Sequence, residues 1–333
     1  MKYQSQQGVA LITILLVVVI ATILGVSMTT AQKFAISRAR SFFDQGIVRQ
    51  YAYGGEELAR QILHEDFLDA PEVDHRSENW ASPDLKFEFE EGEVELLIED
   101  LQGKFNLNSL QGLMPDQKAS GTTTTQLARL RLNNLLSQVG MDRAFTDRIV
   151  DWIDLDEQAN PLGAEDFDYL GLDRPYRTGG QTMVDVSELR LILGMTREQY
   201  DAISPYLTVL PETGSTINVN TASPEILQLV APGLSSVESQ NIVIRRDENL
   251  PFNTVNEFTG DPSIPNASSI KAGTLSVQSS FFQVTVRARY QDRFGYLTSV
   301  IQRNPTDGSM RVIYRDQSKK IMTQVVEEPT DNG

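Results

Sequence analysis

The sequence predicts an α+β fold, in which a long N-terminal helix and a small antiparallel sheet carry a large, mainly helical insertion. Three observations support this prediction. An uncharged apolar run opens the chain, strand-like alternation lies on both sides of a central block, and that block has the spacing of helices. A set of strands interrupted by helices indicates an insertion into an α+β domain.

The apolar run covers residues 9–28 and contains no charged side chain. About 20 residues at roughly 1.5 Å rise per residue cover the ~30 Å hydrocarbon layer of a bilayer. The run therefore predicts a transmembrane helix. Lysine or arginine residues flank it on both sides, so charge alone leaves the orientation open.

Three interpretations of the N-terminus compete. A cleaved secretory signal would need a shorter apolar region and a small-residue site such as Thr29-Thr30-Ala31. A plain uncleaved anchor explains the hydrophobicity but not the abrupt edge between Gly8 and Val9. The third interpretation is a leader that is removed after Gly8. The stretch MKYQSQQGVALITILLVVVI resembles the type IV prepilin pattern, in which a short leader with a lysine ends in glycine before an apolar helix.

The prepilin resemblance implies that residues 1–8 are a leader. A membrane prepilin peptidase would cut between Gly8 and Val9 on the cytoplasmic side, and the new N-terminus at Val9 would be methylated. Most members of that family carry glutamate as the fifth residue after the cut, where it pairs with the subunit ahead; here that residue is Thr13. A charge inside the bilayer costs roughly 3 kcal/mol and persists only where a partner exists. A subunit with none ahead has no use for it, although drift in an ordinary anchor would also give Thr13.

Downstream, the pattern divides the chain into four parts. Apolar residues at helical spacing extend the first helix through residues 29–68, with possible softening at two adjacent glycines. Residues 69–110 contain the first strands, and residues 111–275 read as the helical insertion. Strand alternation returns within residues 276–333, which end in an acidic tail.

Composition argues against several classes of function. The formal net charge of −16 is the wrong sign for nonspecific attachment to nucleic acid or anionic lipid. There is no cysteine, and His64 and His75 are the two histidines, which argues against thiolate metal sites, serine triads and histidine-ligated zinc. The sequence contains no phosphate-loop, GxSxG or HExxH pattern, so we do not expect an enzyme.

The stretch DWIDLDEQANPLGAEDFDYLGLD, residues 151–173, holds eight carboxylates and no lysine or arginine. Like charges packed into one loop repel unless a cation joins them. The spacing approaches that of an EF-hand, but Ala159 stands where the sharp turn needs glycine. We expect a calcium site of other geometry; the alternative is a solvated acidic loop. The candidate ligands are Asp154, Asp156, Glu165, Asp166 and Asp168.

Residues 214–260 resemble a helix-hairpin-helix module, which membrane-anchored DNA receptors also use. Such modules present two glycines to a phosphate, but here Gly233 is followed by Leu234-Ser235-Ser236. The segment also has an excess of acidic residues. We therefore expect a packing unit and no nucleic-acid partner, with a DNA-uptake receptor as the alternative function.

The leader, Thr13, DLQGKFNLNSL and the acidic stretch together resemble the K-type minor pseudopilins of type II secretion, over essentially the whole chain. The resemblance implies a type IV pilin-like fold and a single-pass protein of the inner membrane with its C-terminal domain in the periplasm. It implies a structural role, initiating or capping the pseudopilus tip and assisting export of folded proteins across the outer membrane. Expected partners are other minor pseudopilins through the N-terminal helix, and secreted cargo or the outer-membrane channel. The family includes calcium binders.

Overall fold

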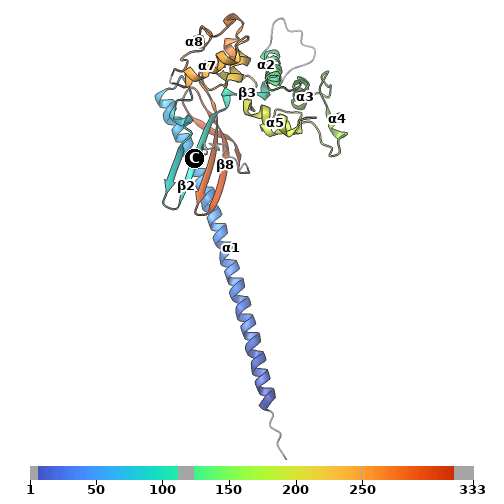
Figure 1. Cartoon of the computed structure of the whole chain (residues 1–333), viewed down its shortest axis with the longest axis vertical. Helices are drawn as coiled ribbons and strands as arrows, with labels where there is room; N and C mark the ends of the chain where they lie inside the picture. Colours follow the sequence, from blue (N-terminus) through green and yellow to red (C-terminus); the bar gives the residue numbers. More distant parts are fainter. Residues whose placement is uncertain (1–6, 112–123, 249, 319–333) are drawn as a thin grey trace, which may run out of the picture.

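The structure is a computed structural model that describes residues 7–111, 124–248 and 250–318, without the side chains of residues 7–9. Most of the expected leader and the expected acidic tail therefore lie outside the described residues. Figure 1 shows one long helix that leaves the body of the protein, a sheet beside its upper part, and a helical domain above the sheet. This arrangement confirms the predicted α+β fold with its helical insertion.

The long helix α1 runs without interruption from Gln7 to Asp69. Its side chains are exposed over the first half, and burial begins at Val48 and continues at Ala52, Ala59 and Leu63. These residues recur at intervals of four and seven, which places them on one face of a helix. The upper part of α1 is therefore a core element, whereas the lower part, below Val48, is mostly exposed and reaches the rest of the chain through hydrogen bonds such as those of Arg40 with Gln291 and of Ser41 with Arg293.

The sheet has five antiparallel strands in the order β1-β2-β7-β8-β9. Their bounds are Leu85–Phe89 (β1), Gly92–Asp100 (β2), Phe281–Tyr290 (β7), Arg293–Arg303 (β8) and Met310–Asp316 (β9). One face packs on the upper part of α1, where inward-facing strand residues such as Val94, Leu96, Val284 and Val286 form a common core with the helix.

Gly55 marks the closest approach of α1 to the sheet. A Cβ at this position would lie 2.6 Å from Val286 Cγ1 and 2.8 Å from Val94 Cγ1. Real side chains do not reach such distances, so only glycine lets the helix lie this close. The two glycines that suggested a soft point in the sequence instead lie in a continuous helix.

The helical domain is inserted between two neighbouring strands. Leu96 on β2 pairs directly with Val286 on β7, although the chain between these strands spans the whole domain. Its helices are α2 (Thr124–Gln138), α3 (Ala144–Ile153), α4 (Asp166–Leu170), α5 (Arg197–Ile203), α6 (Pro224–Val230), α7 (Ser236–Asp247) and α8 (Val255–Thr259).

Two short parallel strand pairs join distant segments of the insertion: β3 (Phe105–Asn106) with β4 (Leu207–Thr208), and β5 (Ile217–Asn218) with β6 (Leu275–Ser276). Short 3-10 helices connect these elements: η1 (Asn79–Ala81), η2 (Leu101–Gly103), η3 (Leu107–Leu110), η4 (Val186–Leu191), η5 (Ser204–Tyr206), η6 (Ala267–Ser269) and η7 (Ala272–Thr274).

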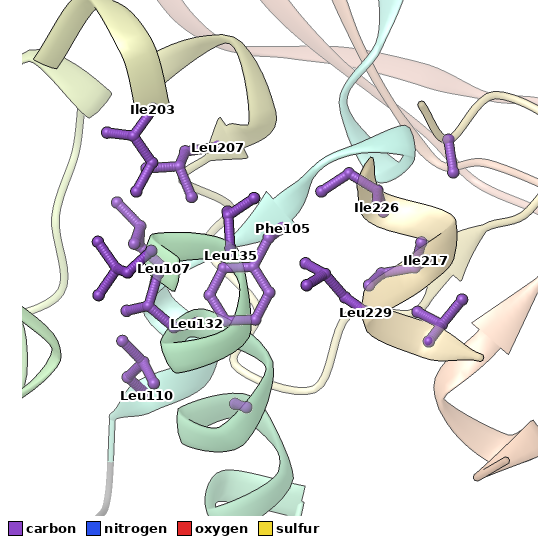
Figure 2. Close-up of a cluster of buried hydrophobic side chains, with 14 of the residues drawn as sticks. Phe105, Leu107, Leu110, Leu132, Leu135, Ile203, Leu207, Ile217, Ile226 and Leu229 are labelled. Atoms are coloured by element: carbon purple, nitrogen blue, oxygen red, sulfur yellow. The ribbon is translucent and has the colours of Figure 1, made fainter. Parts of the chain in front are cut away.

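A separate hydrophobic core holds the insertion together. Figure 2 shows Leu132 and Leu135 from α2 beside Phe105, with Ile226 and Leu229 from α6 in the same cluster. All five side chains are at least 95% buried. The insertion therefore has a hydrophobic core separate from the core under the sheet.

Buried polar groups join the insertion to the sheet. The Asn218 side chain donates hydrogen bonds to Asp100 Oδ2 at 3.1 Å, Ser279 Oγ at 2.8 Å and the Asp74 carbonyl at 3.1 Å. All four residues are buried, so each unmade hydrogen bond would carry a desolvation penalty. This network therefore fixes the helical domain relative to the sheet.

The hairpin of the insertion is built from α6 and α7. Its turn contains Gly233, whose φ of +89° lies in the left-handed region. Arg245 pairs with Asp261, and buried Arg246 donates from Nη1 to the Val219 and Ala222 carbonyls, both at 2.8 Å. Both arginines of the module are thus engaged inside the domain.

Candidate functional site

Three carboxylates meet at the end of α3. Asp151 lies in its last turn, Asp154 follows the helix, and Glu165 immediately precedes α4. One oxygen from each of these three side chains lies within 4.8 Å of the others. Figure 1 places α3 and α4 on the side of the helical domain away from α1. We call these three residues the acidic centre.

The loop between Asp154 and Glu165 folds back over Asp151. The Asp151 carboxylate accepts hydrogen bonds from the backbone N–H groups of Asn160 at 3.2 Å and Ala164 at 2.8 Å. A Cβ at Gly163 would lie 1.7 Å from Asp151 Oδ2, so this turn requires glycine. The sequence thereby brings residues that are more than ten positions apart into one cluster.

The acidic centre has more negative than positive charge around it: the Arg129 guanidinium acts on Asp151 but is itself paired with Asp147. Burial, followed by the negative charges of Asp156 and Asp151, raises the pKa of Asp154 to about 7. Burial and then Asp151, Asp154 and further carboxylates raise the pKa of Glu165 to about 7. Burial also raises the pKa of Asp151. Asp154 Oδ1 and Glu165 Oε1 are buried and have no hydrogen-bond partner among the described residues.

The structure distributes the five sequence-predicted ligands unequally. Asp154 and Glu165 belong to the acidic centre, and Asp156 lies beside it, where its Oδ1 accepts from the Gln158 N–H at 2.9 Å. Asp166 accepts from both the backbone and the hydroxyl of Thr178 at 2.9 Å, and exposed Asp168 accepts from the Glu165 N–H at 3.1 Å.

Sequence reasoning did not single out Asp151 as a ligand. The signal was present, because Asp151 and Asp154 are three residues apart at a helix end and therefore face the same side. Its burial, at 1% exposure, was not visible from the sequence.

The acidic centre fits a divalent cation. Hard cations such as calcium take six to eight oxygen ligands, and three carboxylates with two unpartnered oxygens supply part of such a shell. A cation would also relieve the repulsion that raises both pKa values. The acidic centre can therefore hold a metal ion.

A second carboxylate cluster, Asp66, Asp74 and Glu78, has a different character. The buried Arg303 guanidinium pairs with Asp66 Oδ2 at 3.1 Å and with Asp74. Because an arginine already compensates this cluster, it does not resemble a vacant cation site.

The lower part of α1 is the other functional feature. Gly8 and Val9 lie in its first turn, and from Ala10 onward it is long and apolar enough to cross a membrane, with a most hydrophobic window of mean hydropathy 2.8. Above the apolar run, Phe34, Phe42 and Phe43 are 68–74% exposed. At about 100° per residue, Phe34 and Phe43 lie on opposite sides of the helix, so this stretch exposes aromatic surface around much of its circumference. Exposed apolar surface of this extent generally marks contact with a partner.

Comparisons with known proteins agree over most of the chain. Two models of the family described as Type II secretion system (T2SS), protein K match residues 103–212 and 217–278. A type II secretion system protein K from Pseudomonas aeruginosa is 37% identical, over 95% of this chain and 94% of that protein. The protein of the same name from Klebsiella pneumoniae is 32% identical, over 86% and 91%.

A solved structure shares the fold. The crystal structure of the GspK-GspI-GspJ complex from the enterotoxigenic Escherichia coli type 2 secretion system contains a chain that superposes with a TM-score of 0.71 at 23% identity. The match covers 85% of this chain and 99% of that one. The two chains thus share one fold over the matched part.

Proposed function

This chain belongs to the type II secretion system protein K family of minor pseudopilins, and from that premise we propose that it initiates or caps the pseudopilus at its tip. Its role is structural rather than enzymatic. The observation that carries the proposal is the division of α1, which packs under the sheet above Val48 and leaves an apolar surface below it. The lower part of such a helix can contact other subunits while the domains above it remain free. Assembly at the tip would assist export of folded proteins.

The partners we propose are the minor pseudopilins of the I and J types. The structurally similar chain was crystallised in a complex of that composition. On this chain the contact surface would be the exposed stretch of α1 from Phe34 to Phe43. Secreted cargo or the outer-membrane channel would meet the helical domain, which lies at the opposite end from the membrane segment.

Two features support a terminal position. The Thr13 hydroxyl donates to the Ala10 carbonyl at 2.9 Å, so the side chain that replaces the glutamate carries no charge in need of a subunit ahead. The helical domain also lies above the sheet, where a further pilin-like subunit would have to stack. Both features favour a cap over a shaft position.

We place the protein in the inner membrane, with residues 9–28 spanning the bilayer and the C-terminal domain in the periplasm. Processing between Gly8 and Val9 by the prepilin peptidase, with methylation of Val9, completes this proposal. It rests on the glycine edge of an uncharged apolar run and on the family to which the chain belongs.

Calcium is the ion we propose for the acidic centre. Asp151, Asp154 and Glu165 would be ligands, with Asp156 within reach, and the loop carbonyls and water would complete the shell. The ion would stabilise a loop that otherwise repels itself. Asp166 and Asp168 are weaker candidates because Asp166 already pairs with Arg177, and exposed Asp168 accepts from the Glu165 N–H.

The alternative of a DNA-uptake receptor gains no support from the hairpin. Arg245 is paired with Asp261, and the guanidinium of Arg246 is buried. Phosphate recognition needs positive groups that face the ligand. These two side chains are instead part of the packing of the module.

Site-specific crosslinking tests the proposed position. The chain has no cysteine, so Phe42→Cys introduces a single thiol at a side chain that is 74% exposed. We expect it to trap I- and J-type partners in assembled secretion systems. Val48→Cys, buried under this chain's own sheet, is the matched control and should trap none. Crosslinks to pseudopilin subunits both above and below this chain would overturn the capping role.

A further inference from the structure

A small cavity of about 60 Å³ lies inside the helical domain, and it shares no residue with the acidic centre. Four separate segments line it: residues 105–109, α2, residues 213–217 and the 3-10 helix η7 at Ala272–Thr274. No aspartate or glutamate occurs among its lining residues in the described part of the chain. The cavity belongs to neither the acidic centre nor α1.

Arg131, on α2, lines this cavity and is buried, with 7% exposure. Its Nη2 donates to Thr274 Oγ1 at 2.8 Å, whereas its buried Nε has no hydrogen-bond partner among the described residues. No carboxylate of the described residues pairs with it. Burial lowers the pKa of Arg131 to about 10, which still leaves the guanidinium charged at neutral pH.

The two other buried arginines make the contrast clear. Arg303 pairs with Asp66 and Asp74, and Arg246 pairs with Asp247 at 2.9 Å while it donates to two carbonyls. A buried cation without a counter-charge costs several kcal/mol, so folded proteins normally supply a partner. Arg131 departs from the pattern that this chain itself follows.

The groups around Arg131 are suited to an anion. Ser215 Oγ accepts from Asn106 Nδ2 at 2.9 Å and donates to no described residue, so its hydrogen is available. Backbone at Gly214 and Gly273 also borders the cavity, without a Cβ to keep a ligand away from the chain. A charged guanidinium, a hydroxyl donor and open backbone are the groups that bind oxyanions.

Size decides the class of ligand. A single water needs about 10–15 Å³ of cavity volume. The cavity of about 60 Å³ therefore has room for a few waters or a small ion, but not for a nucleotide or sugar. We propose that this cavity is a binding site for a small oxyanion, a carboxylate or inorganic phosphate or sulfate, with Arg131 as its counter-charge. The site would join α2 to the 213–217 loop and η7 through one bound ion.

Thermal unfolding of the full-length protein in a detergent without phosphate groups tests this site. The probes are sodium phosphate, sulfate and acetate, each against sodium chloride at equal ionic strength. For wild type we expect a saturable rise in Tm with at least one oxyanion. Arg131→Met should weaken the apparent affinity about tenfold or more, because it removes a charge-assisted hydrogen bond. Sulfate and phosphate stabilise proteins generally, so the difference between wild type and variant is the readout.

Wild type and Arg131→Met should exchange their order of Tm between chloride and oxyanion. In chloride alone, Arg131→Met should equal or exceed wild type in Tm, because an apolar side chain replaces an uncompensated buried charge. In saturating oxyanion, wild type should be the more stable of the two. Arg143→Met, at an exposed arginine, is the matched control and should respond like wild type.

Thr274→Val is a second variant for the case in which Arg131→Met fails to fold. Valine has nearly the shape of threonine, so the variant should keep the shape of the site. The variant removes the hydroxyl that holds Nη2 in place, so we expect reduced oxyanion affinity with the fold retained. Equal responses of wild type and both variants to all three anions would overturn the proposal. The proposal would also be overturned if the Tm of wild type were the same in every oxyanion as in sodium chloride of equal ionic strength. The cavity would then hold only water.

Discussion

Arg315 on β9 donates two hydrogen bonds to Glu56 in α1, from Nε at 2.8 Å and from Nη2 at 2.7 Å. Glu56 is buried beneath the sheet, where Ser299 also donates to it. Burial by itself would raise the pKa of Glu56, but the bonds from Arg315 and Ser299 hold that pKa below its ordinary value. Since β9 is an edge strand, this pair fastens the edge of the sheet to the helix.

Arg315→Met should lower the free energy of unfolding by about 1–3 kcal/mol, because the buried Glu56 charge loses its partner. Arg311→Met, on the same strand but hydrogen-bonded to the neutral Gln302 and not to a buried carboxylate, should change it by less than about 0.5 kcal/mol. Denaturant unfolding of the full-length protein measures both.

The effect of Arg315 should also depend on pH. A carboxyl group whose pKa is lowered by folding stabilises the protein above the ordinary glutamate pKa, and this stabilisation is lost as the pH falls through the lowered pKa. The difference between wild type and Arg315→Met should therefore shrink in acid, and a difference that grows there would contradict this account.

Two adjacent glycines in α1 should respond in opposite directions to alanine. Gly55→Ala places a Cβ 2.6 Å from Val286 Cγ1 and should destabilise by about 1–3 kcal/mol, as overpacked cores do. Gly54→Ala meets nothing within 4 Å and should stabilise by up to about 1 kcal/mol through helix propensity. The same unfolding measurement compares them. Equal effects would mean that the helix does not lie as close to the sheet as the contacts require.

Periodicity was sufficient to predict the architecture. The alternation in residues 86–100 and again after Phe281 falls on strands that pair in the sheet, and the run from the apolar segment to Leu68 is one helix. The two glycines of α1 suggested a weak point in the sequence, but the structure shows close packing. Sequence cannot make this distinction, because it depends on what faces Gly55 from β2 and β7.

The sequence predicted that this stretch holds a cation site, but not which carboxylates form it. Eight carboxylates in one stretch indicated a cation site, and Asp154 and Glu165 do lie together. Membership depends on how the loop folds back, which Gly163 and the bonds to Asp151 decide. Arg131 gave no signal in the sequence, since an arginine on an amphipathic helix is normally expected to be exposed to solvent.

Processing of the N-terminus should follow from Gly8. We expect the mature chain to begin at Val9 with a methylated amine, because glycine lets the backbone enter the peptidase site. Gly8→Leu should block cutting, whereas Gly8→Ala, with a much smaller side chain, should be cut at least in part. Mass spectrometry of the purified full-length proteins measures the outcome. Retention of Met1 in wild type, or a start near Gln32, would refute the prepilin interpretation.

Calcium should stabilise the protein through the acidic centre. Binding to the folded state alone adds RT ln(1 + [L]/Kd), about 2.7 kcal/mol at a hundredfold excess of ion over Kd. Asp151→Asn and the Asp154→Asn, Glu165→Gln double variant should remove the difference in Tm between calcium and chelator. Asp173→Asn, an exposed carboxylate in the same stretch, should keep it. If wild type melts identically in calcium and chelator, the loop is a solvated acidic face.

The calcium effect should also depend on pH in a defined direction. Without metal, Asp154 and Glu165 have pKa values of about 7, above those of the unfolded chain, so the folded state holds protons that the unfolded chain releases. The stability of the metal-free protein therefore falls as the pH rises from about 4 through about 7. Calcium binds the deprotonated carboxylates and must displace these protons, so its affinity should rise over the same range. The calcium-dependent increase in Tm should consequently be small near pH 5 and large near pH 8, and it should be lost in the double variant. An increase of equal size at both pH values would show that the ion binds elsewhere.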